Sequence, residues 1–222
     1  MAEKANTPRR APLSRDRILR AAVALADETG IESFSMRRLG HELGVVPMAL
    51  YKHVASKEEL LDGMVDIVFA EIDDPSTGVD WKVAMRRRAI SAREALKRHG
   101  WAIGRMESRM NPGPANLRHH NAVMRCLREA GFSFAMTVHA YSVQDSYIYG
   151  FALQEKTLPF ETPDEHGEIV QQKAETVDDT TQYPYLLEVA ANVTRSGYDY
   201  AAEFAWGLDL ILDSLERMRN AD

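Results

Sequence analysis

The sequence predicts an all-α protein, and three observations support that prediction. Apolar residues recur with the three- and four-residue spacing of helices through most of the chain from Ser14 onward. No segment shows the sustained two-residue alternation and hairpin turns typical of strands. The 222 residues, 45% of them apolar and 27% charged, are enough for a buried core. No apolar run approaches the ~20 residues needed to cross a bilayer.

The first two helices are predicted from their capping residues and apolar stripes. Residues 1–13 are polar and contain two prolines, so we expect a flexible arm. Ser14 is a suitable N-cap for a first helix that ends before Gly30. A second, short helix is expected after Ser35, and Gly44 ends it.

Two further helices follow in the N-terminal part of the chain. A third helix is expected over about 47–53, since proline is tolerated in a first turn. Ser56 and Glu59 have the spacing of a capping box, which predicts a fourth helix over roughly 56–72. The run 73–78 contains Asp, Pro and Gly, and it breaks the helical pattern.

The rest of the chain is also predicted to be helical, apart from one acidic segment. The stretch 158–182 contains seven acidic residues, one lysine and two prolines with little periodicity, so we expect a mobile loop. We expect one domain over 14–60 and a second over 61–222. Helices in the second domain are expected over about 81–98, 101–110, 115–130, 134–156, 183–194 and 197–219.

The net charge of −6 is the average of two unlike parts. Residues 1–57 contain ten Lys and Arg and six Asp and Glu, a net of +4, whereas the rest of the chain carries −10. A basic end on an acidic body is typical of a nucleic-acid contact surface carried by a separate module. Charge alone leaves open the alternative that the basic end is simply solvated.

Composition and motifs exclude other classes of protein. The first residues contain no apolar leader, and the single Cys126 cannot form an internal disulfide, so we expect a cytoplasmic protein without a membrane partner. There is no glycine-rich phosphate loop, Gly-x-Ser-x-Gly elbow or His-Glu-x-x-His pair. The adjacent His119 and His120 would point about 100° apart on a helix and make a poor metal site. We therefore expect no enzyme, no metal and no cofactor.

Two short helices joined by a tight glycine turn, with a longer helix on either side, have the organisation of a helix-turn-helix. In that motif the second short helix enters the major groove of DNA. Leu50 and Val54 are expected to face inward. The outward residues would then be Met48, Ala49, Tyr51, Lys52 and His53. The residues expected beside the DNA backbone are Arg37, Arg38 and Lys57.

The outward face offers two kinds of DNA contact. The Tyr51 hydroxyl can donate to a phosphate, and Lys52 can neutralise one. Ala49 or Met48 can touch the methyl group of a thymine. The pattern alone leaves open a structural helical hairpin with a solvated face.

Between Ser14 and about Ile72, a set of residues stands at the spacing of the hallmark positions of a known protein family, without gaps. They are Ile18, Ala21, Ala22, Leu25, Gly30-Ile31-Glu32, Ser35-Met36-Arg37-Arg38-Leu39, Leu43-Gly44-Val45, Leu50-Tyr51-Lys52-His53-Val54 and Ser56-Lys57-Glu58-Glu59-Leu60-Leu61. This run, about a quarter of the chain, resembles the N-terminal domain of the tetracycline-repressor (TetR) family.

The resemblance implies a transcriptional regulator, usually a repressor, that binds a palindromic operator as an all-α homodimer. By position it implies phosphate contacts from Arg37, Tyr51, Lys57 and the backbone of Met36. It implies base readout by Pro47, Met48, Ala49, Lys52 and His53. The tetracycline repressors have Gln-Pro-Thr where this chain has Pro-Met-Ala, so its operator is expected to differ.

Residues 79–157 resemble the ligand domain of the tetracycline repressors. The matching segments are Asp80-Trp81, Arg93-Glu94-Ala95-Leu96 with His99, Asn111-Pro112-Gly113-Pro114, 127–133 and 149–155. The segment 204–216 resembles the closing helix of many members. By resemblance, that helix and the one over 134–156 form a four-helix bundle with the same helices of a partner.

Each of these two helices has a glycine in its middle. Glycine in a helix interior costs about 1 kcal/mol of stability relative to alanine, so its presence agrees with a close approach of another helix at that point. The predicted dimer interface comprises Gly150, Leu153, Phe204, Gly207, Leu208, Ile211 and Leu215. A monomer with a widely buried helix is the alternative.

A ligand pocket is expected between the helices over 81–130 and the helix over 134–156. Its predicted residues are Met85, Arg88, Trp101, Met106, Arg109, Met124, Leu127, Tyr141, Gln144 and Asp145. A stripe of Met and aromatic residues can equally be ordinary core. Met106 and Gln154 stand where the family holds a magnesium-associated His and Glu, so we expect a flat or apolar ligand other than tetracycline with magnesium.

The leading hypothesis is a ligand-responsive dimeric repressor whose fourth helix, 56–72, joins the DNA reader to the ligand body. Release of the operator requires that the effector binds the DNA-competent and DNA-incompetent states with different affinity. An activator is one alternative. A helical interaction module that has lost DNA binding is another. The basic residues of the reader argue against it: Arg37, Arg38, Lys52 and Lys57.

Overall fold

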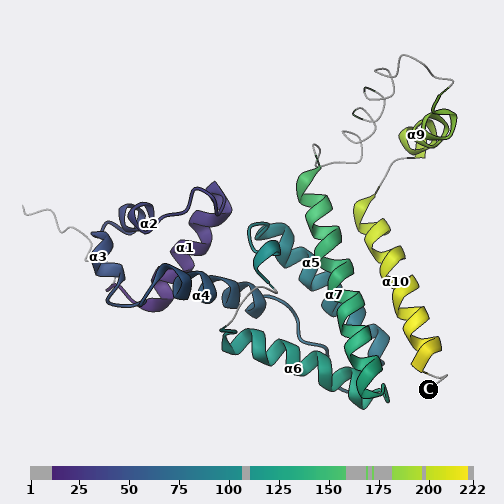
Figure 1. Cartoon of the computed structure of the whole chain (residues 1–222), viewed down its shortest axis with the longest axis horizontal. Helices are drawn as coiled ribbons and strands as arrows, with labels where there is room; N and C mark the ends of the chain where they lie inside the picture. Colours follow the sequence, from purple (N-terminus) through teal and green to yellow (C-terminus); the bar gives the residue numbers. More distant parts are fainter. Residues whose placement is uncertain are drawn as a thin grey trace, which may run out of the picture. The chain divides into compact units, whose positions relative to one another are not determined.

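The computed structural model describes residues 12–106, 111–158, 169, 172, 182–196 and 199–219 of the chain. These residues form α-helices and one 3₁₀ turn, and the described ranges contain no strand (Figure 1). The all-α prediction is confirmed. None of the described helices is both long and apolar enough to cross a membrane.

The chain divides into two compact units. The first comprises the residues up to Ile72 together with Arg98–Asn121, and the second comprises Asp73–Lys97 together with the chain from Ala122 onward. The first unit contains α1 (Arg15–Thr29), α2 (Met36–Leu43), α3 (Pro47–Leu50), α4 (Lys57–Ala70), the 3₁₀ turn η1 (Ile103–Arg105) and the first half of α6 (Pro114–Glu129). The second contains α5 (Trp81–Arg98), the rest of α6, α7 (Phe134–Thr157), α9 (Pro184–Ser196) and α10 (Tyr200–Arg219).

The domain boundary predicted between residues 60 and 61 falls inside α4. It stays a prediction of where the DNA-binding and ligand-binding functions divide.

Helix starts follow the predicted capping residues. The side chains of Ser14, Ser35 and Ser56 each accept a hydrogen bond from the backbone nitrogen three residues on, at 3.3, 3.2 and 3.0 Å. A carboxylate oxygen of Glu59 accepts from the backbone nitrogen of Ala55 at 2.5 Å, so the return bond of the predicted capping box goes to the residue before the N-cap rather than to Ser56 itself. Gly44 ends α2 in the left-handed conformation, with φ of 66°, as a residue without a Cβ readily does.

Two predicted helices are shorter in the structure. Regular helix in α3 ends at Leu50, and the next three residues form a turn in which the backbone nitrogen of His53 donates to the carbonyl of Leu50 at 2.9 Å. The helix predicted over 101–110 is wrong for its described part, because only η1 is helical there. The backbone bonds of this segment span three residues, as in Ala102 to His99 at 2.8 Å, and this tighter pattern replaces the α-helical one.

Other predicted segments lie outside the described residues. These are residues 1–11 of the arm, 107–110, and the acidic segment 158–182 except Leu158, Ile169, Gln172 and Gln182. Ile169 and Gln172 are helical.

The core of the first unit holds the short helix α3 in place. α1 packs against α2 and α4, and α2 packs against α3. Ile18 of α1, Leu39 of α2 and Leu60 of α4 are fully buried, as is Leu50 of α3. A four-residue helix has little stability of its own, so its position depends on this packing.

Polar contacts around His99 also tie the first unit together. The Nδ1 atom of His99 lies 2.8 Å from the Asp27 carboxylate of α1, and its Nε2 atom lies 3.1 Å from the Glu71 carboxylate that follows α4. Trp101 donates its indole N–H to the same Asp27 at 2.7 Å. Burial opposes the ionisation of Glu71, but hydrogen bonds from Arg98 and His99 outweigh it and lower the pKa of the carboxyl. The contacts fasten the ends of α1 and α4 to the segment after α5.

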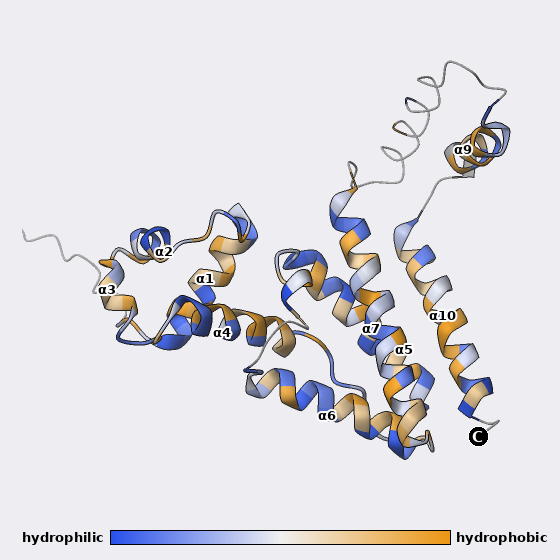
Figure 2. Ribbon diagram, viewed as in Figure 1, coloured by the Kyte–Doolittle hydropathy of each residue, from blue (hydrophilic) through white to orange (hydrophobic). Residues whose placement is uncertain are grey.

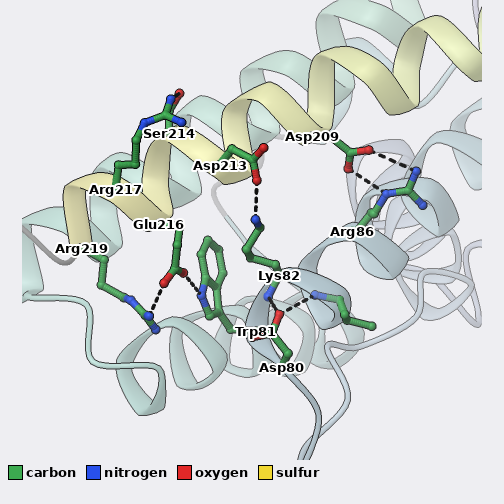
Figure 3. Close-up of polar contacts among 11 residues, drawn as sticks. Asp80, Trp81, Lys82, Arg86, Asp209, Asp213, Ser214, Glu216, Arg217 and Arg219 are labelled. Carbon is green, nitrogen blue, oxygen red and sulfur yellow. Dashed lines mark hydrogen bonds and ion pairs between the residues drawn. The ribbon is translucent and has the colours of Figure 1, made fainter.

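In the second unit, a row of polar contacts fastens α5 to α10 (Figure 3). The Trp81 indole N–H donates to Glu216 at 2.6 Å. Lys82 pairs with Asp213, and Arg86 pairs with Asp209 at 2.8 Å. Along α10 the partners Glu216, Asp213 and Asp209 are three and four residues apart, about one helical turn each, so the row sets the register of the two helices.

A buried ion pair joins α5 to α7. A guanidinium nitrogen of Arg88 lies 2.6 Å from the Asp145 carboxylate, and both side chains are almost fully buried. Burial would lower the pKa of the Arg88 guanidinium, but the charge of Asp145 and its contact with the guanidinium, together with Tyr149 and Tyr141, outweigh burial and raise it. Arg93, five residues further along α5, donates to Glu155 of α7 at 2.8 and 2.6 Å.

The buried and exposed ion pairs of α5 are expected to differ strongly in their effect on stability. Arg88→Ala leaves Asp145 charged and unpaired in the interior, and we expect it to lower the free energy of unfolding by about 3–5 kcal/mol. The matched change Lys82→Ala removes a partly exposed pair, and we expect a loss of at most about 1 kcal/mol. Urea unfolding followed by circular dichroism measures both. Equal losses would show that the Arg88 pair is not the buried contact described here.

Candidate nucleic-acid interface and effector site

The outer face of α3 carries three exposed apolar or aromatic side chains. Leu50 and Val54 are buried, as predicted, so the opposite side of the turn faces outward. From the N-cap to the C-cap of α3, the exposed fractions are 69% for Val46, 71% for Met48 and 42% for Tyr51. The face therefore combines large hydrophobic groups with a phenol hydroxyl.

The structure places most of the predicted DNA-contacting residues at the surface of the first unit. The exposed ones are Arg37, Arg38, Met48, Tyr51, Lys52 and Lys57. Pro47, Ala49 and His53 are half-buried. The side chain of Met36 is buried, so only its backbone, at the first position of α2, is available for the contact predicted for it. DNA contact by all ten residues stays a prediction.

The basic residues of this face differ in how they are held. Within the described part of the chain, Arg37, Arg38 and Lys52 form no ion pair with a carboxylate. Lys57 donates to the backbone carbonyl of Phe34 at 3.3 Å, and its nitrogen lies 5.8 Å from the centre of the Phe34 ring. Exposed cations without acidic partners are available to neutralise phosphates.

Val46 is a surface residue that the sequence interpretation missed. It is the N-cap of α3, in an extended conformation, and it makes no side-chain capping bond. The signal in the sequence was an apolar residue directly before Pro47, at a position where Ser, Thr, Asp or Asn usually caps a helix.

The predicted effector residues are divided between the two units. Seven of them belong to the second unit: Met85, Arg88, Met124, Leu127, Tyr141, Gln144 and Asp145. Trp101 and Met106 belong to the first unit and are buried there, and Trp101 is bonded to Asp27. Arg109 lies outside the described residues.

Within the second unit, the structure brings three of the polar effector residues into one buried cluster on α5 and α7. Arg88 and Asp145 form the ion pair, and Gln144 is the next residue of α7. The amide nitrogen of Gln144 donates to the carbonyl of Ala140 at 2.9 Å, whereas its buried oxygen Oε1 has no hydrogen-bond donor in the described chain. A buried acceptor without a partner costs about 1–3 kcal/mol, so a water or ligand that donates to it would be bound favourably.

The predicted dimer residues fall into two groups. Phe204, Leu208 and Leu215 are buried, and Phe204 stacks on Tyr147 of α7 with ring centres 5.3 Å apart. A Cβ at Gly207 would meet the Tyr147 hydroxyl, which explains glycine at this close approach of α10 to α7. Gly150 and Leu153 are exposed, and Ile211 is half-buried. The role of this set in a dimer stays a prediction.

An apolar groove of about 510 Å³ runs between α7 and α10. Met136, His139, Ser142, Val143, Leu210, Ile211, Ser214, Leu215 and Met218 line it. Figure 2 shows hydrophobic residues along both helices. Trp206, Leu210 and Met218 of α10 are each more than half exposed, so this face leaves much apolar surface in water.

Two family models match the chain. "Bacterial regulatory proteins, tetR family" matches residues 18–64, and "Tetracyclin repressor-like, C-terminal domain" matches residues 74–219. The HTH-type transcriptional repressor DrrR1 of Streptomyces coeruleorubidus is 31% identical over 94% of this chain and 80% of its own length. The tetracycline repressor protein class A from transposon 1721 of Escherichia coli is 29% identical over 91% of this chain and 90% of its own length.

Solved structures show the same fold across the chain. The TetR family protein ActR of Streptomyces coelicolor, in complex with actinorhodin, has a TM-score of 0.76 and 26% identity, covering 94% of this chain and 99% of its own. ActR has also been solved with (S)-DNPA, with a TM-score of 0.72, 26% identity and coverage of 92% of this chain and 98% of its own.

Proposed function

The chain belongs to the TetR family of bacterial transcriptional regulators, and from that premise we propose that it is a dimeric repressor released from its operator by a small molecule. The observation that carries the DNA-binding part is the exposed surface of α2 and α3, where Arg37 and Arg38 have no acidic partner among the described residues. The DNA phosphates attract such cations, and the major groove between the two phosphate backbones is wide enough to accept the short helix α3. An activator with the same reader is the second candidate, and reporter expression in a deletion strain separates the two.

The effector part of the proposal rests on the second unit. The buried Arg88, Gln144 and Asp145 offer fixed polar groups within an otherwise apolar helical core, as ligand sites commonly do. The structures of ActR with actinorhodin and with (S)-DNPA support an organic ligand for a protein of this fold. The effector releases DNA only if it binds the free protein more tightly than the operator-bound protein.

The dimer part of the proposal rests on α7 and α10. Their apolar groove and the exposed Trp206, Leu210 and Met218 would be covered by the same helices of a second copy. Two copies related by a two-fold axis would present two α3 helices, which suits a palindromic operator.

Removal of a positive charge from the exposed surface around α2 and α3 is expected to lower the affinity for DNA and to make that affinity less dependent on salt. Lys52→Gln and Arg38→Gln should each lower the slope of log K against log salt by about 1 per half-site. Fluorescence anisotropy over a series of salt concentrations measures this, with a duplex taken from beside the protein's own gene. The matched control Arg87→Gln removes an exposed charge from α5, and its slope should equal that of the wild type. Unchanged slopes for both reader variants would contradict the interface.

A charge in the α7–α10 groove is expected to separate the protomers. Leu210→Arg places an unpaired cation in an apolar interface, so its molar mass by light scattering should fall to that of one chain, and operator binding should be lost. Leu117→Arg makes the same change at a 56% exposed leucine of α6 and should leave the mass unchanged. A wild-type mass of one chain would contradict the dimer.

Molecules that bind the second unit are expected to release the operator. Thermal unfolding in the presence of a panel that includes actinorhodin and tetracycline, with and without magnesium, identifies ligands that stabilise the protein. Each stabilising ligand should lower the affinity of the protein for its operator. Gln144→Leu should weaken this effect of the ligand, and without ligand the variant should bind the operator as the wild type does. A ligand that binds equally well to the free and the operator-bound protein would contradict ligand-responsive repression.

A further inference from the structure

Two apolar side chains at the start of α3 are largely exposed. Val46 and Met48 are 69% and 71% exposed, more than the neighbouring Tyr51. The half-buried Pro47 and Ala49 continue the apolar surface around them. Large hydrophobic side chains left this exposed two residues apart in the chain are unfavourable in water, so they indicate a contact made in another state of the molecule.

Backbone geometry fixes how this apolar surface is presented. Val46 is β-branched and sits in the extended N-cap conformation, with φ of −70° and ψ of 145°, directly before Pro47. Leu50 holds the other end of α3 in the core. Val46 is thus a stiff projection, whereas Met48 has a flexible side chain that can adapt to a surface.

The chemistry of these side chains selects among base pairs. Val offers no hydrogen-bond donor or acceptor, and the thioether sulfur of Met is only a weak acceptor. In the major groove, guanine, cytosine and adenine present polar groups that would lose water beside such side chains without gaining a partner. Thymine alone presents a methyl group there, which favours contact with an apolar side chain.

Charge at the surface of the same unit favours DNA over a protein partner. Arg37 and Arg38 at the start of α2 are exposed without ion pairs in the described chain, and so is Lys52 two residues beyond α3. A docking site for an apolar protein surface would bring these cations into a desolvated interface, whereas DNA offers phosphates to all three.

We propose that Val46 and Met48 are specificity-determining residues that read thymine methyl groups, so that each operator half-site carries one or two thymines in contact with them. The inference rests on the proposed function and adds the base identity that the reader selects. Burial of one methyl group is worth roughly 0.8 kcal/mol, which corresponds to about a fourfold change in affinity per methyl.

The test removes single methyl groups from the DNA. Operator sequences are first selected from a random duplex library on the full-length protein, and each thymine of the selected half-site is then replaced by deoxyuridine, which keeps the base pair and lacks only the methyl. One or two of these replacements should weaken binding about fourfold per half-site, as measured by fluorescence anisotropy.

Protein variants assign the effect to the two residues. In Met48→Ala or Val46→Ala, at least one sensitive thymine should become indifferent to its replacement by deoxyuridine. The control Leu117→Ala truncates an exposed leucine of α6 and should keep the full sensitivity. Because all three side chains are more than half exposed, circular dichroism should show the same fold in each variant.

The possible failures are distinguishable. If the library yields no enriched sequence and no duplex is bound at low salt, the proposed function itself is overturned. If an operator is selected but no thymine is sensitive, or the sensitivity persists in both alanine variants, the thymine reading is overturned while the proposed function stands. The inference is overturned in the same way if Met48 binds another protein and the thymine methyl groups have no effect on DNA affinity.

Discussion

The burial of Leu50 is the contact on which the DNA reader depends. α3 is four residues long, and a helix of that length is not stable unless the rest of the fold holds it. Leu50 is fully buried in the core of the first unit, so the direction of the opposite face follows from the position of this one side chain. The left-handed Gly44 brings the chain from α2 into α3, and the N-cap Ser56 starts the next helix shortly after the turn.

The second unit uses polar contacts of two different kinds for two purposes. The exposed row from α5 to α10 fixes the register of helices whose outer face remains apolar. Exposed ion pairs contribute little free energy, so their effect is mainly geometric. The pair of Arg88 with Asp145 lies inside the unit, where an ion pair is costly to bury and is retained for specificity or function in some proteins. Together with the Gln144 oxygen, which has no hydrogen-bond partner among the described residues, it gives the helical core a polar centre.

The sequence predicted the helical architecture well where the signal was local. Serine caps, the Gly44 stop and the inward placement of Leu50 all depend on residues a few positions apart, and all are confirmed. The helix predicted over 101–110 was wrong because the conformation there involves residues far away in the sequence. His99 and Trp101 bond to Asp27, and a tighter 3₁₀ turn forms in place of the α-helix. For the same reason the sequence could not tell that Phe204 stacks inside the protomer on Tyr147, nor that Val46 is exposed. The contact roles of the reader and effector residues remain predictions.

The central claim is that this chain binds DNA through the outer face of α2 and α3, with Met48 in the interface. The ten methionines can be labelled at their methyl carbons, and each gives one NMR signal in the full-length protein. When operator DNA is added to saturation, the Met48 signal should move, while those of the buried Met64 and Met85 should change little, because their side chains have no access to the DNA. A Met48 signal that stays in place while the protein is saturated with DNA would contradict the claim.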